Sequence, residues 1–147
     1  MQMRWYPNSS MNKYLGTGQN RNEGVTNTDI ITNEYGPYDA STNKYAAGYC
    51  KSLGSQWYLP ADNELNELYD IKGSLSLTFQ SALYWSSTEC YGNGMSNGGT
   101  GGFDCSTDTT ATGFAAVLAR VQIFDGGERN AGIKGVDNDW VRCIQAF

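Results

Sequence analysis

Histidine is absent from this chain of 147 residues. Without it there is no Ser-His-Asp or Cys-His catalysis, no histidine-ligated zinc and no ordinary proton shuttle near neutral pH. Basic side chains are also few, at 10 Lys and Arg against 15 Asp and Glu, and they form no run. Since a phosphate backbone is bound by clustered basic residues, nucleic acid is not an expected partner. The absence of histidine excludes most familiar hydrolase chemistry, and we expect a protein that is not an enzyme.

Long apolar runs are missing too. The longest, such as residues 114–119, fall far short of the roughly 20 residues that a membrane helix needs. We therefore expect no membrane insertion. Residues 1–7 lack the charged region and apolar stretch of a secretory signal. We expect that a leader has been removed, or that the protein leaves the cell by another route, such as release of a phage particle.

Charged residues make up 17% of the chain, below the usual quarter or so, whereas aromatic residues reach 13% and glycine numbers 18. This composition argues against a disordered chain, a coiled coil and a collagen helix. The length suits one compact domain, which we expect over residues 1–147.

Two helices are predicted after a polar stretch over residues 1–40, which we expect to be irregular, with short strands near 4–6 and 28–32. The first helix begins at Ser41 or Thr42 and ends at Gly54, with aromatic and apolar residues on one face. The second follows Pro60 and ends at Gly73. Its apolar stripe consists of Leu65, Leu68 and Tyr69.

The pattern changes after residue 74. Short strands are predicted at 83–87, 114–118, 120–124 and 140–144, and the glycine-rich residues 91–102 predict a surface loop. Two helices followed by a run of strands indicate an α+β fold, with residues 41–147 as its core.

Four cysteines, Cys50, Cys90, Cys105 and Cys143, allow three disulfide pairings, and the residues alone do not choose among them. No CxxC spacing points to zinc or to a redox motif. A nested pairing would join the first helix to the last strand and separately hold both ends of the glycine-rich loop. The alternative is four free thiols, which an intracellular location would require.

Four segments carry a family resemblance: residues 45–50 (YAAGYC), 57–65 (WYLPADNEL), 84–89 (YWSSTE) and 141–144 (VRCI). In order and spacing they resemble the Lcl C-terminal domain family of bacterial and phage surface proteins, related to Fibrobacter-type paralogous domains. The resemblance implies a C-type-lectin-like fold, with two helices packed on a twisted antiparallel sheet with long loops. It also supports the nested bridges Cys50–Cys143 and Cys90–Cys105, and it implies core positions for Trp57, Tyr84 and Trp85.

The chain departs from sugar-binding C-type lectins. Their Glu-Pro-Asn or Gln-Pro-Asp element has no counterpart here, because the only prolines are Pro7, Pro37 and Pro60. Calcium-dependent sugar binding is therefore not implied. The reactive cysteine pair of formylglycine-generating enzymes, which share the fold, has no evident counterpart either.

The candidate sites lie in loops. Asp137, Asn138 and Asp139 offer the oxygen ligands that Ca²⁺ prefers, although a polar turn before Trp140 explains them equally simply. Two loops mix aromatic area with adaptable polar groups, which is typical of binding loops, and solvated loop tips are the alternative. Their candidate residues are Tyr91, Asn93, Met95 and Asn97 in one loop, and Arg129, Asn130, Lys134 and Asn138 in the other.

The sequence thus favours a recognition or adhesion module on a bacterial surface or phage particle, binding a cell-surface protein or glycan through disulfide-braced loops. The alternative is a structural subunit of a fibre, pilus or virion that assembles through residues 1–40. We expect an extracellular or virion location and no cofactor other than calcium. Homo-oligomers are compatible with either function.

Overall fold

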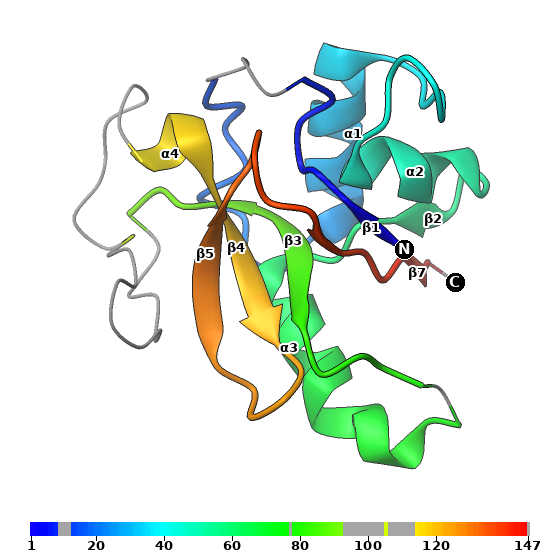
Figure 1. Cartoon of the computed structure of the whole chain (residues 1–147), viewed down its shortest axis with the longest axis vertical. Coiled ribbons are helices and arrows are strands. Elements are labelled where there is room, and N and C mark those ends of the chain that lie inside the picture. Colours follow the sequence, from blue (N-terminus) through cyan, green and yellow to red (C-terminus); the bar gives the residue numbers. More distant parts are fainter. Residues whose placement is uncertain (9–12, 77, 93–104, 106–113, 147) are drawn as a thin grey trace.

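The computed structural model describes residues 1–8, 13–76, 78–92, 105 and 114–146 (Figure 1). In these residues, helices pack on a mostly antiparallel sheet, which confirms the α+β class. No helix in these ranges has both the length and the apolar character that crossing a bilayer requires.

The main sheet has five strands in the order β1-β6-β3-β4-β5. They are β1 (Gln2–Met3), β3 (Leu83–Glu89), β4 (Leu118–Ile123), β5 (Arg129–Ile133) and β6 (Asp139–Trp140). Neighbouring strands are antiparallel except β3 and β6, which run parallel. A second, two-stranded sheet pairs β2 (Trp57–Tyr58) with β7 (Ile144–Gln145).

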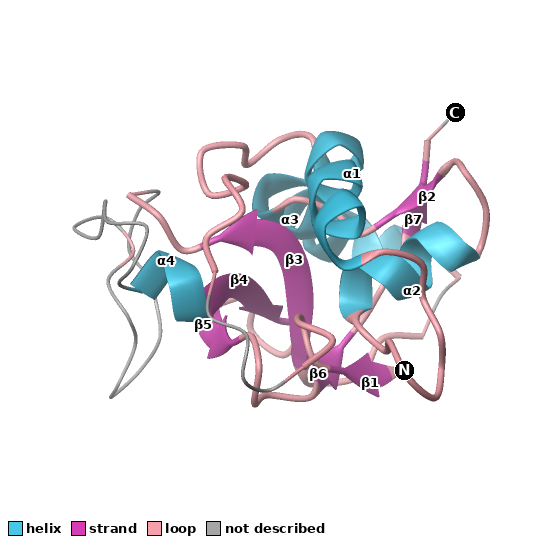
Figure 2. Cartoon of the chain, turned by 90° about the horizontal axis from the view of Figure 1, so that it is seen from above, coloured by secondary structure: helices cyan, strands magenta, loops and turns pink. Residues whose placement is uncertain are grey.

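The described part of the chain contains four helices and one 3₁₀ turn: α1 (Gly24–Tyr35), α2 (Ala46–Ser52), α3 (Asp62–Ile71), η1 (Lys72–Ser74) and α4 (Phe114–Val117). Figure 2 shows α1 and α3 above β3, with α2 beside α1 and α4 at the opposite end of the molecule from β2 and β7. Both termini lie on the side of α2 and away from α4 (Figures 1 and 2).

The largest apolar cluster joins the N-terminal segment, α1, α2 and the centre of the sheet through side chains such as Trp5, Tyr45 and Trp85. A second cluster surrounds Leu65 and Tyr84 under α3, with Leu68 and Tyr69 packed against it. The predicted apolar stripe of the second helix is therefore confirmed.

Side chains in the first turn of α3 explain where this helix begins. Asp62 and Glu64 lie in its first turn, where the helix dipole favours negative charge. The Glu64 carboxylate also accepts hydrogen bonds from the backbone N–H of Ala61 at 3.0 Å and of Gly24 at 2.5 Å. Glu64 therefore ties the first turn of α3 to the first turn of α1.

The prediction that residues 1–40 are irregular and strand-containing is wrong for α1. Residues 28–32, expected to be extended, lie in this helix. Thr28 is buried, and its hydroxyl accepts a hydrogen bond from the N–H of Leu59 at 3.0 Å. Because this contact spans 31 residues, helix formation here depends on tertiary structure.

Gly24 allows α1 to lie close to the chain before α3. A Cβ at this position would lie 2.5 Å from the carbonyl oxygen of Leu59 and 2.7 Å from the nitrogen of Ala61. Gly24→Ala is expected to lower the free energy of unfolding by about 1–3 kcal/mol, because rigid backbone must move. Gly73→Ala, where a Cβ meets nothing within 4 Å, is the matched control. Denaturant unfolding measures both, and equal stability of the two variants contradicts this explanation.

Three other predicted boundaries differ from the structure. The first predicted helix begins at Ala46 rather than at Ser41 or Thr42, because residues 39–43 form a turn in which Asp39 accepts backbone hydrogen bonds. Residues 114–117 are helical rather than extended. The predicted last strand, 140–144, is divided between β6 and β7, which belong to different sheets.

The nested disulfide pairing is confirmed. Cys50 in α2 is bonded to Cys143, which lies between β6 and β7, and Cys90 at the end of β3 is bonded to Cys105. All four cysteines are thus paired. Disulfides persist in oxidising compartments, so the bridges indicate an extracytoplasmic environment.

Candidate ligand-binding pocket

The four tryptophans of the chain fall into two pairs. Trp5 and Trp85 are at most 1% exposed, and both indole N–H groups are bonded. Trp5 donates to the carbonyl of Ser86 and Trp85 to that of Met3, each at 2.8 Å. These two rings hold the N-terminal segment on β3 and are structural, in agreement with the core position that the resemblance implies for Trp85.

Trp57 and Trp140 are different. Both rings are only partly buried, and neither indole N–H has a hydrogen bond to a described residue. Both line the same hollow, which has a volume of about 270 Å³. A half-exposed amphipathic ring with an unpaired donor is typical of a binding surface, because it offers apolar area and one directed hydrogen bond. The pair marks this hollow, here called the aromatic pocket, as the candidate site.

Several elements on the α2 side of the molecule build the aromatic pocket. Tyr49 comes from α2, Trp57 from β2, Tyr84 from β3 and Trp140 from β6. Its other lining residues are Met1, Leu53, Thr78, Gln80, Val141, Arg142 and Cys143. Because Cys143 is bonded to Cys50, the outer disulfide fixes the α2 wall of the pocket against the β6 wall.

One glycine and two paired strands set the position of Trp57. Gly54 ends the α2 region with φ +146°, and a Cβ there would lie 3.3 Å from the Trp57 ring. Trp57 then pairs with Gln145 across the small sheet. On the other wall, Trp140 pairs with Gln2 and with Tyr84 in the main sheet. Both rings therefore stand on backbone held by strand pairing, although β2 and β6 have only two residues each.

The polar groups at the rim of the aromatic pocket include the Arg142 guanidinium and the Gln80 side-chain amide. The Arg142 guanidinium lies 4.6 Å from the centre of the Phe79 ring and donates from Nη2 to the carbonyl of Thr78 at 2.7 Å. Tyr84 accepts a hydrogen bond from the backbone N–H of Gln80 at 2.8 Å, while the Gln80 side chain has no bond to a described residue. No lining residue is acidic. The pocket therefore suits a neutral or anionic ligand that presents hydrogen-bonding oxygens.

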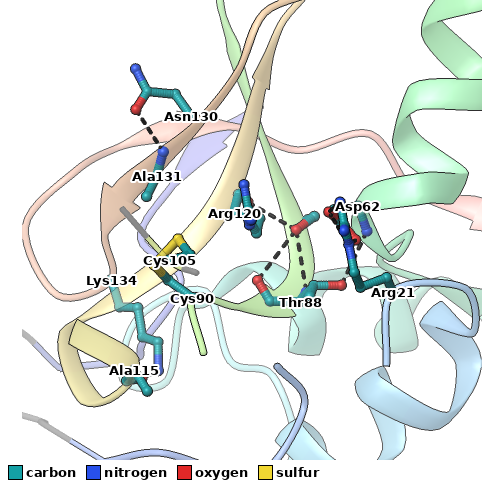
Figure 3. The surroundings of a disulfide bond; sticks show 11 residues. Arg21, Asp62, Thr88, Cys90, Cys105, Ala115, Arg120, Asn130, Ala131 and Lys134 are labelled. Carbon is teal, nitrogen blue, oxygen red and sulfur yellow. Dashed lines mark hydrogen bonds and ion pairs between the residues drawn. A yellow bond between two sulfur atoms is a disulfide. The ribbon is translucent and has the colours of Figure 1, made fainter. Parts of the chain in front are cut away.

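Lys134, predicted as a loop residue that contacts a ligand, is wholly buried, so this prediction is wrong. Its ammonium group donates to Glu89 at 2.5 Å and to the carbonyl of Ala115 at 2.7 Å. The Glu89 carboxylate is also buried and accepts hydrogen bonds from the backbone N–H groups of Leu15 and Thr17. Burial lowers the pKa of Lys134 to about 8, and the ion pair with Glu89 opposes this shift. Figure 3 shows Lys134 and Ala115 beside the Cys90–Cys105 bridge.

Arg129 and Asn130 lie in β5 rather than in a loop. Arg129 donates to the side chain of Asn63 at 2.8 Å and lies 3.5 Å from Asp62, which also binds Arg21. The Asn130 side chain accepts a hydrogen bond from the N–H of Ala131 at 2.8 Å (Figure 3). The Arg129 guanidinium is thus engaged in a polar cluster that connects α3 with the sheet.

Of the remaining loop candidates, Tyr91 and Asn138 are described, and neither lines the aromatic pocket. Tyr91 stacks on Tyr14, with ring centres 4.4 Å apart. Asn138 lines another hollow, of about 290 Å³, together with Arg4 and Lys44. Asn93, Met95 and Asn97 lie outside the described residues. The structure therefore does not bring the predicted residues together into one site.

Of the calcium candidates, Asp137 binds a backbone N–H group, and Asp139 has a carboxylate oxygen without a partner among the described residues. Asp137 accepts a hydrogen bond from the N–H of Ile133 at 2.6 Å, as expected for a polar turn. Asp139 has a buried carboxylate oxygen without a partner among the described residues. Over the same residues, no group of three or more Cys, Asp and Glu side chains is placed to hold a metal ion.

Asp139 predicts a pH dependence of stability. Burial, and secondarily the charge of Asp137, raise the pKa of Asp139 from 3.8 to about 7. The folded state therefore binds more protons than the unfolded state between about pH 4 and pH 7, and this group makes stability fall as pH rises through that range. Asp139→Asn is expected to raise stability by about 1–2 kcal/mol at pH 8, a value reduced for partial exposure, and to change nothing at pH 4.

Thermal unfolding at the two pH values measures this difference. Asp125→Asn, in an exposed turn, is the matched control, because it removes one carboxylate without removing a buried one. A gain for Asp139→Asn that is the same at both pH values contradicts the assignment to proton binding.

Comparisons with protein-family models, with curated proteins and with solved structures find no match to this chain. The function proposed below therefore rests on the geometry of the site, on the two disulfides and on the family resemblance.

Proposed function

We propose that this chain is a non-enzymatic recognition module of a bacterial surface or phage particle, and that it binds a protein or glycan partner at the aromatic pocket. The observation that carries the proposal is the pair of half-exposed tryptophans, Trp57 and Trp140, with unpaired indole N–H groups in one pocket. The two disulfides support an external location, because such bonds persist outside the cytoplasm.

The backbone around the aromatic pocket is held rigidly, and this also supports a binding function. The backbone of the aromatic pocket is held by two sheets and by the Cys50–Cys143 bridge. A site that is fixed before the ligand arrives loses less conformational freedom on binding, which favours affinity. A C-type-lectin-like arrangement fits this role, since it places helices and a disulfide behind an exposed face, and we propose it as the finer description of the fold.

The alternative, a subunit that assembles through residues 1–40, is less well supported. Within these residues Met3, Trp5, Tyr6 and Ile31 belong to the main apolar cluster. A segment that supplies core side chains to its own domain is not free to serve as an assembly arm. We therefore do not adopt this alternative.

Binding of the purified chain to an array of glycans and cell-surface proteins tests the proposal. We expect at least one partner to be bound, and Trp140→Ala to weaken that binding at least tenfold, because it removes a central aromatic contact. Circular dichroism establishes that the variant is folded. Val136→Ala, an exposed side chain outside the aromatic pocket, is the control and is expected to bind normally.

The same binding assay distinguishes a binding site in the aromatic pocket from a binding site in the loop that contains Tyr91. If Tyr91→Ala abolishes binding and Trp140→Ala does not, the partner is held by the loop region and the site is wrongly placed. Binding that disappears with a calcium chelator also contradicts the proposal, because the aromatic pocket contains no acidic ligand for a cation.

A further inference from the structure

Arg4 and Lys44 have no polar partner, in contrast to the other basic side chains. Of the 10 Lys and Arg residues, five form ion pairs, two donate to backbone carbonyls, and Arg120 is buried and engaged. Neither Arg4 nor Lys44 has a hydrogen bond or ion pair within the described part of the chain. Both line the hollow of about 290 Å³ that Asn138 also lines, here called the basic hollow. The two unpaired positive charges therefore meet at one place.

The backbone that carries these two side chains is fixed. Arg4 lies between β1 and Trp5, a ring that is 1% exposed, and its carbonyl accepts a hydrogen bond from the N–H of Ala46 at 3.0 Å. Lys44 directly precedes Tyr45, which is also buried. The positions of both residues are thus set before a ligand arrives, which reduces the conformational freedom lost on binding.

The other groups of the basic hollow complement a carboxylate on a short apolar stem. The hydroxyls of Ser41 and Thr42 and the side-chain amide of Asn138 add hydrogen-bond donors, and no lining residue is acidic. The volume lies below the range of about 300–1,000 Å³ that is typical of pockets for drug-sized molecules, and it suits a single side chain. The apolar lining residues are Met3, Pro7 and Ala40.

Asp39 narrows the class of anion. Its carboxylate accepts hydrogen bonds from the backbone N–H groups of Ser41 and Thr42, each at 2.8 Å, and it pairs with neither Arg4 nor Lys44. Tetrahedral anions such as phosphate are commonly bound by several backbone N–H groups, and at this turn those two are already occupied. The planar guanidinium remains, and it matches a carboxylate through two parallel hydrogen bonds.

We propose that the basic hollow binds a carboxylate side chain, Glu or Asp, of a protein partner, with Arg4 as the bidentate donor and Lys44 as the second cation. The basic hollow shares no lining residue with the aromatic pocket. The inference therefore goes beyond the proposed function, and each of the two can fail without the other.

Titration of the isotope-labelled chain, followed by NMR, tests the inference. The probes are end-capped hexapeptides that contain one Glu or Asp, and the same peptides with Gln or Asn are the neutral references. We expect at least one acidic peptide to shift the amide signals of Arg4, Lys44 and Asn138. Its neutral counterpart is expected to bind about tenfold more weakly, because charge-assisted hydrogen bonds are lost.

Variants of the two cations sharpen the test. Arg4→Gln is expected to weaken acidic-peptide binding about tenfold, and Arg4→Lys about threefold, because lysine keeps the charge and lacks the planar fork. Lys13→Gln is the matched control, since it removes a positive charge that is paired with Glu34 outside the basic hollow. It is expected to bind normally, and circular dichroism establishes that each variant is folded.

Several results overturn the inference. Equal binding of acidic and neutral peptides, or equal losses in Arg4→Gln and Lys13→Gln, contradicts recognition of a carboxylate by these cations. Inorganic phosphate or sulfate that binds at the same residues more tightly than every acidic peptide shows a site for tetrahedral anions instead. A panel in which no peptide shifts the signals of the basic hollow also refutes the inference, while binding of a partner at the aromatic pocket leaves the proposed function standing.

Discussion

Replacing Cys50 and Cys143 together by alanine is expected to lower the free energy of unfolding by about 4–5 kcal/mol. The bridge spans 93 residues, and closing so large a loop removes much of the conformational freedom of the unfolded chain. Small domains have a total stability of about 5–15 kcal/mol, so this change uses a large part of it. Denaturant unfolding of the variant and the parent, both under non-reducing conditions, measures the loss.

The inner bridge is the natural comparison. Cys90 and Cys105 are separated by only 15 residues, so their replacement by alanine is expected to cost about 3 kcal/mol. The outer pair also fixes two walls of the aromatic pocket, whereas the inner pair lies near α4. Ligand binding is therefore expected to be weaker only in the outer variant. If loss of the inner bridge costs more stability than loss of the outer one, loop closure does not explain the effect of these bridges.

Breaking the buried ion pair between Glu89 and Lys134 is expected to cost about 3–5 kcal/mol, because the remaining charge stays buried without its counterion. Both side chains are 0% exposed, so water cannot solvate the charge that is left. Glu89→Gln and Lys134→Met are the informative single variants. Thermal or denaturant unfolding measures each loss.

The double variant Glu89→Gln/Lys134→Met removes both charges and completes a double-mutant cycle. It is expected to be more stable than the sum of the single losses predicts, by about 1–3 kcal/mol, because no uncompensated charge remains. Additive losses in the cycle are the result that contradicts a direct ion pair. The charge-neutral control is Thr17→Val, which removes a hydroxyl bonded to Glu89 and leaves both charges in place.

The features that were predictable from the sequence are local or are imposed by covalent chemistry. The second predicted helix, α3, has acidic residues in its first turn and an apolar stripe at helical spacing, and both signals lie within ten residues. The nested cysteine pairing was expected from the family resemblance, because four cysteines by themselves allow three pairings. The α+β class follows from the change of pattern after residue 74.

The features that were missed depend on distant parts of the chain. The sequence of α1, GVTNTDIITNEY, is rich in β-branched residues and has a weak helical pattern. It is helical because Thr28 accepts a hydrogen bond from the N–H of Leu59, and the Asn27 amide donates to the carbonyl of Asn20, both outside the helix. No signal within residues 24–35 reveals these partners.

The residues of the candidate site were missed for the same reason, because their surroundings come from distant parts of the chain. Lys134 is followed by a glycine, and the sequence predicts a ligand-binding loop there, yet its partner Glu89 is 45 residues away. The four tryptophans look alike in sequence, and only the fold separates the pair with bonded N–H groups from the pair in the aromatic pocket.

The pairing of β1 with β6 has a consequence for how this domain matures. Gln2 lies opposite Trp140, so one edge of the main sheet forms only when residues 2–3 meet residues 139–140, from the far side of the described sequence. Contacts so far apart slow folding and leave apolar surface uncovered in the meantime. This edge of the main sheet therefore stays unpaired until residues 139–140 have been synthesised, so completion of the sheet is a late step in the folding of this domain.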